Sequence, residues 1–246
     1  MQQTDKNIIM GRNPVMEALS SGKEMEKLHV CKGTEGSIKK ITAMARDRGV
    51  PIHYEENEVF RKLTTGNHQG VIAVVSAFTY CDVDDILSLA EKRGEKPFII
   101  ILDGVEDPHN LGAVIRTAEA AGAHGVIIPK RRSAAVTETV IKASAGATEY
   151  MLCARVSNIV QTIERLKDKG LWMGVADTGG EPYHRTDLKG AIGLVIGGEG
   201  AGVGRLVKEK CDFTLSIKMK GRIGSLNVSN AAAVLMYEVQ RQRDEG

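Results

Sequence analysis

Polar side chains that could position a substrate gather in segment 224–230, GSLNVSN, directly before an apolar run at 231–236. Ser225, Asn227, Ser229 and Asn230 place hydroxyl and amide groups close together. A helix N-terminus needs only one such side chain as a cap. We therefore expect one of them to cap the C-terminal helix and the others to be free to line a site. A helix start with redundant caps is the alternative interpretation.

A glycine-rich segment, LVIGGEGAGVG, continues an apolar run at 194–204. Glycines there allow positive φ angles and let a ligand approach the backbone closely. Their spacing matches neither the dinucleotide-binding fingerprint nor the P-loop, and Glu199 in the middle would repel a phosphate. The segment therefore suits an uncharged or cationic ligand, and a plain tight turn is the alternative.

Another segment, LDGVEDPHNLGAVIRTAEAAG, joins an apolar strand signal to a helix signal. In chain order this is the first polar segment, residues 194–204 are the second and residues 224–230 are the third. Asn110 is well placed to cap that helix, whose apolar stripe runs through Leu111, Ile115 and Ala118. Arg116 lies off the stripe. Its simplest structural role is an exposed pair with Glu119, which would contribute only about 0.2–0.5 kcal/mol.

Apolar runs separated by helical patterns position these three segments. The expected strands from residue 98 onward are FIIILD, GVIIP, LWMGVA, IGLVIGG and FTLSI, and the expected helices span 111–121, 137–144, 158–169 and 227–243. Continuous apolar strands alternating with helices predict an α/β fold with a parallel sheet flanked by helices. Ligands bind at the carboxyl ends of such strands, where all three segments lie.

The chain is expected to divide into two domains. Residues 1–76 carry the alternating signals of a small α/β unit, residues 77–96 form a polar linker with one short amphipathic helix, and residues 97–246 form the larger domain.

Composition narrows the class of protein. The 246 residues carry 33 Lys and Arg against 31 Asp and Glu, so net charge alone does not indicate a nucleic-acid partner. Basic clusters at 130–132 and 205–222 flank the polar segments, however, and favour a polyanion. The four cysteines form no CxxC pair, so neither a metal site nor a disulfide framework is expected. With no apolar signal segment and no run near the ~20 residues of a membrane span, we expect a cytoplasmic protein without membrane contact.

Three motifs, NLGAVIRTAEAAG, LVIGGEGAGV and SLNVSNAAAVLMYE, resemble in order the signature motifs of the SpoU (TrmH-like) ribose 2′-O-methyltransferases of the SPOUT superfamily. The match extends over residues 98–243. GRNPVMEAL and NHQGVIAVV resemble the small ribosomal-protein-like RNA-binding domain of RlmB-type members, which modify a guanosine of 23S rRNA.

The resemblance implies a C-terminal trefoil knot, a homodimer with its active site at the subunit interface, and S-adenosyl-L-methionine as cofactor. The cofactor-binding positions carried over are Thr178, Gly197, Ile217 and Leu226. The substrate-side and catalytic positions carried over are Asn110, Arg116, Glu199, Ser225 and Asn227.

The reaction implied moves a methyl group from a sulfonium to a ribose hydroxyl, and holding the reactants together can supply about 7–11 kcal/mol. The resemblance makes Arg116 the residue that activates the hydroxyl. A guanidinium is hard to deprotonate, so stabilisation of the developing alkoxide is the alternative role.

Three other functions stay open from the sequence. A tRNA-modifying relative would share the three motifs. A non-catalytic RNA-binding protein could keep the fold, and a nucleotide-dependent oxidoreductase could use a parallel sheet, although the glycine fingerprint it needs is missing.

Overall fold

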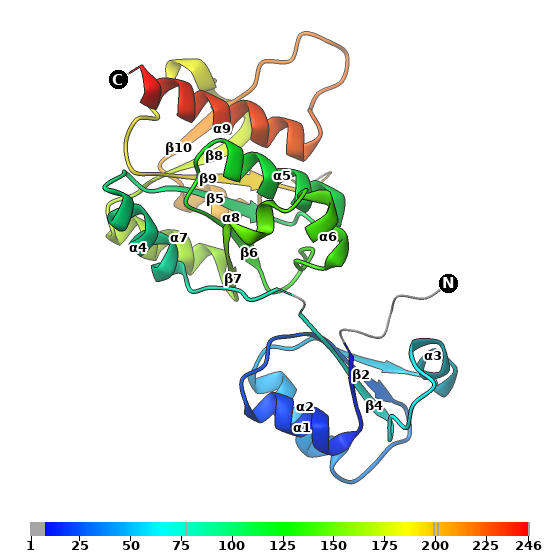
Figure 1. Cartoon of the computed structure of the whole chain (residues 1–246). Helices are drawn as coiled ribbons and strands as arrows, with labels where there is room; N and C mark the ends of the chain where they lie inside the picture. Colours follow the sequence, from blue (N-terminus) through cyan, green and yellow to red (C-terminus); the bar gives the residue numbers. More distant parts are fainter. Residues whose placement is uncertain (1–7, 77, 199, 201, 246) are drawn as a thin grey trace. The chain divides into compact units, whose positions relative to one another are not determined.

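The computed structural model describes residues 8–76, 78–198, 200 and 202–245. The chain forms two compact units, Met1–Thr79 and Tyr80–Gly246 (Figure 1). The division falls within the segment 77–96 that was expected as a linker. The helix of that segment, α4 (Val83–Arg93), contacts strand β7 of the larger unit, Leu152–Val156.

The N-terminal unit is a four-stranded sheet with three helices. Its strands lie in the order β1 (Ile8–Met10), β4 (Val71–Val75), β2 (Met25–Cys31) and β3 (Ile52–Glu55). The helices are α1 (Arg12–Ser20), α2 (Ile38–Asp47) and α3 (Asn57–Leu63). Apolar side chains of α1 and α2 form one buried cluster with β2 and β4, which gives this unit a core of its own.

The larger unit contains a six-stranded sheet in which every neighbouring pair is parallel. The strand order is β10 (Phe213–Ser216), β8 (Trp172–Pro182), β9 (Ile192–Gly197), β5 (Phe98–Asp103), β6 (Gly125–Pro129) and β7. β5 is buried from Phe98 to Leu102, as a strand covered on both faces should be. The predicted fold class, a parallel sheet flanked by helices after a small α/β unit, is confirmed.

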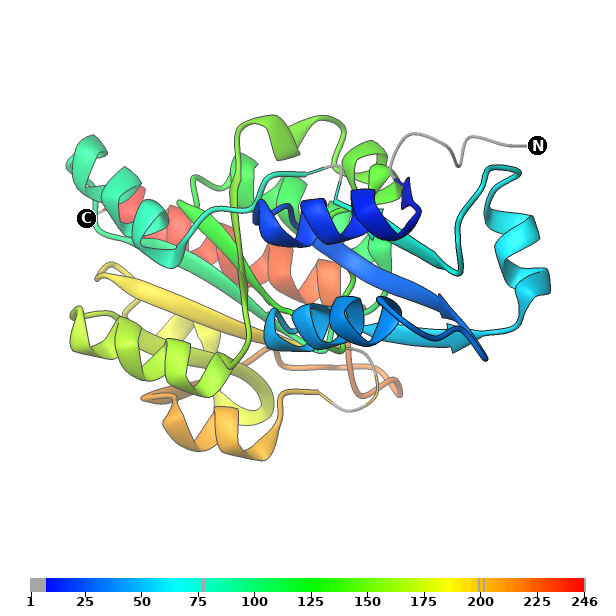
Figure 2. The ribbon, with the colours of Figure 1, turned by 90° about the horizontal axis from the view of Figure 1, so that it is seen from below.

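Helices cover both faces of this sheet (Figures 1 and 2). On one face α4, α7 (Ile159–Asp168) and α8 (Arg205–Lys210) share a buried cluster with alternate side chains of β5. On the other face α5 (Pro108–Ala120) packs against α6 (Glu138–Ala143) and α9 (Val228–Asp244). Among the residues described, no helix is long and apolar enough to span a bilayer.

The strand order reverses between β5 and β9. The chain runs from β5 through β6 to β7 at one edge, and β9 then lies on the other side of β5. In the register of this central pair Asp103 lies opposite Gly197. A crevice outside the carboxyl ends of strands opens at such a reversal, so the fold places the first two polar segments where ligands bind.

Candidate active site

The first polar segment begins its helix earlier than the sequence suggested. Asp107 is the N-cap of α5, its Oδ1 accepts a hydrogen bond of 2.8 Å from the His109 backbone N–H, and Pro108 occupies the first turn. The expected capping role of Asn110 is therefore wrong, because the Asp-Pro pair supplies a complete helix start three residues upstream. Asn110 lies inside the first turn with a buried side chain, 9% exposed.

The third polar segment supplies the cap expected of it. Asn227 caps α9 by accepting a hydrogen bond of 3.0 Å from the Ser229 backbone N–H. Its amide Nδ2 also donates to Asn110 Oδ1 at 3.0 Å, which joins residues 117 positions apart. The two helices α5 and α9 thus bring their N-termini together at the carboxyl edge of the sheet.

The glycine-rich segment turns tightly against the end of β5. The Gly198 N–H donates to the Asp103 carbonyl at 2.7 Å, and the Gly204 N–H donates to the Asp103 carboxylate at 2.9 Å. A Cβ at Gly197 would lie 2.3 Å from the Gly202 carbonyl carbon, and one at Gly198 would lie 1.8 Å from the Gly104 oxygen. Both positions must therefore be glycine for the turn to close. Glu199, expected in the site, lies outside the described residues.

A cavity of about 620 Å³ opens between this turn and the third polar segment. Six of the predicted positions line it: Thr178, Gly197, Ile217, Ser225, Leu226 and Asn227. Asn110 lines a neighbouring cavity and reaches this one through its hydrogen bond to Asn227. The structure therefore brings seven of the nine predicted positions to one region of the sheet edge.

An ion pair in the same cavity was not expected from the sequence. The Lys208 ammonium, on α8, pairs with the Asp177 carboxylate, and both residues line the cavity. The hydrogen bond from Lys208 and a second one from the Thr178 backbone lower the pKa of Asp177. No sequence signal links these residues, because their proximity depends on how α8 packs beside β8.

Arg116 lies apart from the cavity. Its side chain is exposed on α5 and lines neither cavity, and it forms no ion pair with Glu119 or with another residue in the described part of the chain. The simple surface pair considered from the sequence is therefore not formed. The Arg116 guanidinium is therefore accessible to a group that approaches this exposed face of α5.

The lining of the cavity matches an amphipathic, unphosphorylated ligand. Apolar walls come from Leu215, Ile217, Met219 and Leu226, while Thr178 and Ser225 add hydroxyl groups. Its lysine is already paired with a carboxylate, so no free cation of the described lining awaits a phosphate. The volume lies within the usual range for small-molecule sites. No described group of three or more His, Cys, Asp and Glu side chains could hold a metal ion.

Replacing Asn227 with alanine is expected to lower the free energy of unfolding by about 0.5–2 kcal/mol, because α9 loses its cap and Asn110 loses its donor. Asn227→Asp keeps the cap acceptor but loses the donor to Asn110. The Asn227→Asp protein should therefore keep most of its free energy of unfolding and still impair the site, because it lacks the contact with Asn110. Urea unfolding measures the free energy of unfolding of both variants.

Asn230→Ala is the matched control, since Asn230 is exposed in the first turn of the same helix. It should leave the free energy of unfolding unchanged. An Asn227→Ala protein as stable as the wild type would contradict the capping role.

Comparison with known proteins agrees with this geometry. Residues 97–237 match the SpoU rRNA Methylase family, and residues 8–81 match the RNA 2′-O ribose methyltransferase substrate-binding domain. A TrmH family tRNA/rRNA methyltransferase of Bacillus subtilis, YacO, is 45% identical over 238 residues, covering 96% of each chain. A relative from Staphylococcus aureus is 40% identical over 243 residues, covering 98% of each chain.

Solved structures of other proteins share this fold. The SpoU methyltransferase AviRb of Streptomyces viridochromogenes, solved in complex with AdoMet, aligns with a TM-score of 0.63 and 26% identity, over 97% of this chain and 91% of that one. The TrmH/SpoU tRNA modifying enzyme of A. aeolicus aligns with a TM-score of 0.56 and 27% identity, over 66% of this chain and 84% of that one. Together with the two family matches, these findings confirm the resemblance seen in the motifs: the chain belongs to the SpoU rRNA methylase family.

Proposed function

We propose that this RNA methyltransferase transfers the methyl group of S-adenosyl-L-methionine to the ribose 2′-oxygen of a guanosine in 23S rRNA, in the cytoplasm. The observation that carries the proposal is the meeting of the three motifs, with the glycine turn and the third segment around one cavity and Asn110 hydrogen-bonded to Asn227. The match of residues 8–81 to a ribose methyltransferase substrate-binding domain favours the 2′-oxygen as the acceptor.

The 620 Å³ cavity is the proposed cofactor site. When bound there, S-adenosyl-L-methionine supplies an electrophilic methyl group on a sulfonium. The missing side chain at Gly197 lets the glycine turn close beside the cavity, and Ile217 and Leu226 give apolar walls to a nucleoside. Thr178 offers a hydroxyl at the cavity wall. Glu199 stays a position that the resemblance assigns to the site.

The remaining residues are proposed to hold the ribose. The Asn227 amide is fixed at once by its cap interaction and by Asn110, so the pair can orient a hydroxyl without reorganising. Ser225 lies in the exposed segment beside them. Arg116 is proposed to stabilise the alkoxide that develops as the 2′-hydroxyl loses its proton.

A homodimer would supply Arg116 to the cavity of the partner subunit. Its exposure outside both cavities of its own chain supports this arrangement. Large apolar side chains also stay exposed at α9, where Ile223 before the helix is 75% exposed and Tyr237 on it is 49% exposed. The trefoil knot implied by the resemblance belongs to the same proposal. It is supported by the common cavity that segment 217–227 forms with the glycine turn.

Methylation of purified rRNA tests the function. Ribosomal RNA and tRNA from a strain lacking the gene are incubated with the protein and methyl-labelled S-adenosyl-L-methionine, and the labelled nucleotide is mapped. Label at one guanosine ribose of 23S rRNA is the expected result. Label in tRNA alone would favour the tRNA-modifying alternative. No heat of binding for S-adenosyl-L-methionine in calorimetry would favour a non-catalytic RNA-binding protein.

Removing residues 1–76 is expected to reduce methylation of 23S rRNA at least about tenfold, because two linked RNA-binding sites raise each other's effective concentration. Affinity for S-adenosyl-L-methionine should stay close to that of the full chain, since the cavity lies wholly in the larger unit. Calorimetry and the rRNA assay measure the two effects separately. Full activity of the shortened chain would show that the N-terminal unit does not recognise the substrate.

A further inference from the structure

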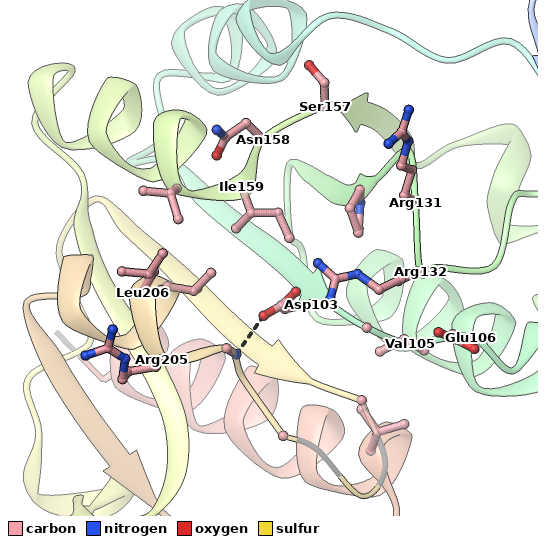
Figure 3. Close-up of a pocket in the computed structure, with 18 of the residues that line it drawn as sticks. Asp103, Val105, Glu106, Arg131, Arg132, Ser157, Asn158, Ile159, Arg205 and Leu206 are labelled. Carbon is pink, nitrogen blue, oxygen red and sulfur yellow. Dashed lines mark hydrogen bonds between the residues drawn. The ribbon is translucent and has the colours of Figure 1, made fainter. Parts of the chain in front are cut away.

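A second, larger cavity lies beside the proposed cofactor site at the carboxyl ends of β5, β6 and β7 (Figure 3). Its volume is about 1270 Å³, and it shares Gly198, Gly202 and Val228 with the smaller cavity. Asn110 lines the larger cavity and Asn227 the smaller one, so their hydrogen bond lies where the two meet. The proposed methyl donor does not need the larger space.

The loop after β6, residues 130–136, forms one wall of this cavity and is held firmly on both sides. The Lys130 N–H donates to the Val156 carbonyl at 2.8 Å, and the Ala134 N–H donates to the Val105 carbonyl at 2.8 Å. The Val136 N–H donates to the Tyr80 hydroxyl at 2.7 Å. These bonds fix the backbone of the loop to three separate segments.

Within this fixed loop Arg132 adopts a left-handed backbone conformation, with φ of +56°. A non-glycine residue pays a conformational cost there, and such a conformation persists only where the surroundings impose it. Strain of this kind gathers at ligand-binding positions. The hydrogen bonds of the loop therefore hold Arg132 in this conformation, which sets the direction in which its side chain leaves the backbone.

That direction is into the cavity. In Figure 3 the Arg132 guanidinium points toward Asp103, whereas Arg131 points away from it. Asp103 is already hydrogen-bonded to the Gly204 N–H, and Arg132 forms no ion pair within the described residues. Arg205, across the cavity, is paired with Glu209 at 3.2 Å. Arg132 is thus an exposed, directed cation without a protein partner among the residues described.

We propose that Arg132 binds a phosphodiester of the RNA strand next to the ribose that receives the methyl group. A guanidinium presents a planar fork of N–H donors that matches two phosphate oxygens. The carboxylates of Glu106 and Asp107 also line the cavity, so it suits a local phosphate at Arg132 better than a long run of backbone. The proposal rests on the proposed function and names a substrate-binding residue for it.

Arg132→Gly tests the proposal, because glycine accepts the same backbone conformation while removing the guanidinium. Its melting temperature should stay at the wild-type value, which separates binding from folding. Filter binding with a labelled 23S rRNA transcript is expected to show about a tenfold loss of affinity. The slope of log affinity against log salt should fall by about 0.7 for one lost phosphate contact. Calorimetric affinity for S-adenosyl-L-methionine should not change.

Arg131→Ala is the matched control: it removes the same charge from the neighbouring residue, which lines the same cavity but whose side chain points away from Asp103. It should keep wild-type RNA affinity. Wild-type affinity and salt slope in Arg132→Gly, or an equal loss in Arg131→Ala, would overturn the proposal. Because filter binding does not depend on turnover, a wild-type protein that binds rRNA without methylating it would refute the proposed function and leave the Arg132 result interpretable.

Discussion

An Arg116→Ala protein is expected to bind S-adenosyl-L-methionine as the wild type does and to lose methyl transfer by about 10²–10³-fold or more. Cofactor affinity should survive because Arg116 lines neither cavity of its own chain. Transfer should fail because the variant lacks the guanidinium that is proposed to stabilise the developing alkoxide. Calorimetry and single-turnover methylation of 23S rRNA measure the two effects.

Glu119→Ala on the same exposed face of α5 is the control, and it should keep wild-type turnover. Arg116→Lys keeps the charge but loses the fork of donors, so partial activity would favour an electrostatic role. An Arg116→Ala protein with near-normal turnover would refute any catalytic role for this residue.

The proposed dimer can be tested with the Arg116→Ala variant. In a two-fold dimer whose arginine acts on the partner's cavity, mixing Arg116→Ala chains with chains defective in the cofactor cavity restores one complete site per mixed dimer. Random assembly should then recover about a quarter of wild-type activity. No recovery on mixing would place Arg116 and the cavity it serves in one chain.

The strongest sequence signals correctly identified the elements that position the site. The apolar runs of β5, β6, β8, β9 and β10 are strands, and the polar segments follow β5, β9 and β10. Among the described strands and α-helices of the larger unit, two were not expected: β7, LCARV, and α8, RLVKEK. Both are short and carry charged residues inside them, so they owe their conformation to packing against β6 and α7 rather than to their own pattern.

Contacts between distant segments could not be deduced from local patterns. The hydrogen bond from Asn227 to Asn110 depends on the strand order, which the sequence did not specify. The capping role expected of Asn110 is wrong because a cap and a side chain in the first turn of a helix look alike in sequence, and it is Asp107 that has the capping geometry. The left-handed Arg132 gave no signal, because nothing in KRRS distinguishes a directed arginine from a solvated one.

Gly197→Ala is expected to lower affinity for S-adenosyl-L-methionine at least about tenfold, because the turn must open to admit a side chain. The added carbon would lie 2.3 Å from Gly202 and 2.4 Å from the Val203 nitrogen, and backbone atoms cannot rotate away as a side chain does. Overpacking of this kind costs about 1–3 kcal/mol, which a domain stable by about 5–15 kcal/mol survives. The Gly197→Ala protein should therefore fold, but it should bind S-adenosyl-L-methionine poorly.

Gly224→Ala provides the matched comparison. Gly224 lines the same cavity, but a carbon added there meets nothing within 4 Å, so its affinity for S-adenosyl-L-methionine should change little. Calorimetry on both variants, with urea unfolding to confirm that each is folded, shows whether the loss of affinity comes from the clash at Gly197 or follows any substitution in the cavity lining. Wild-type affinity in a folded Gly197→Ala protein would mean that the methyl donor does not contact this turn, because a ligand seated against Gly197 must respond when the turn is forced apart.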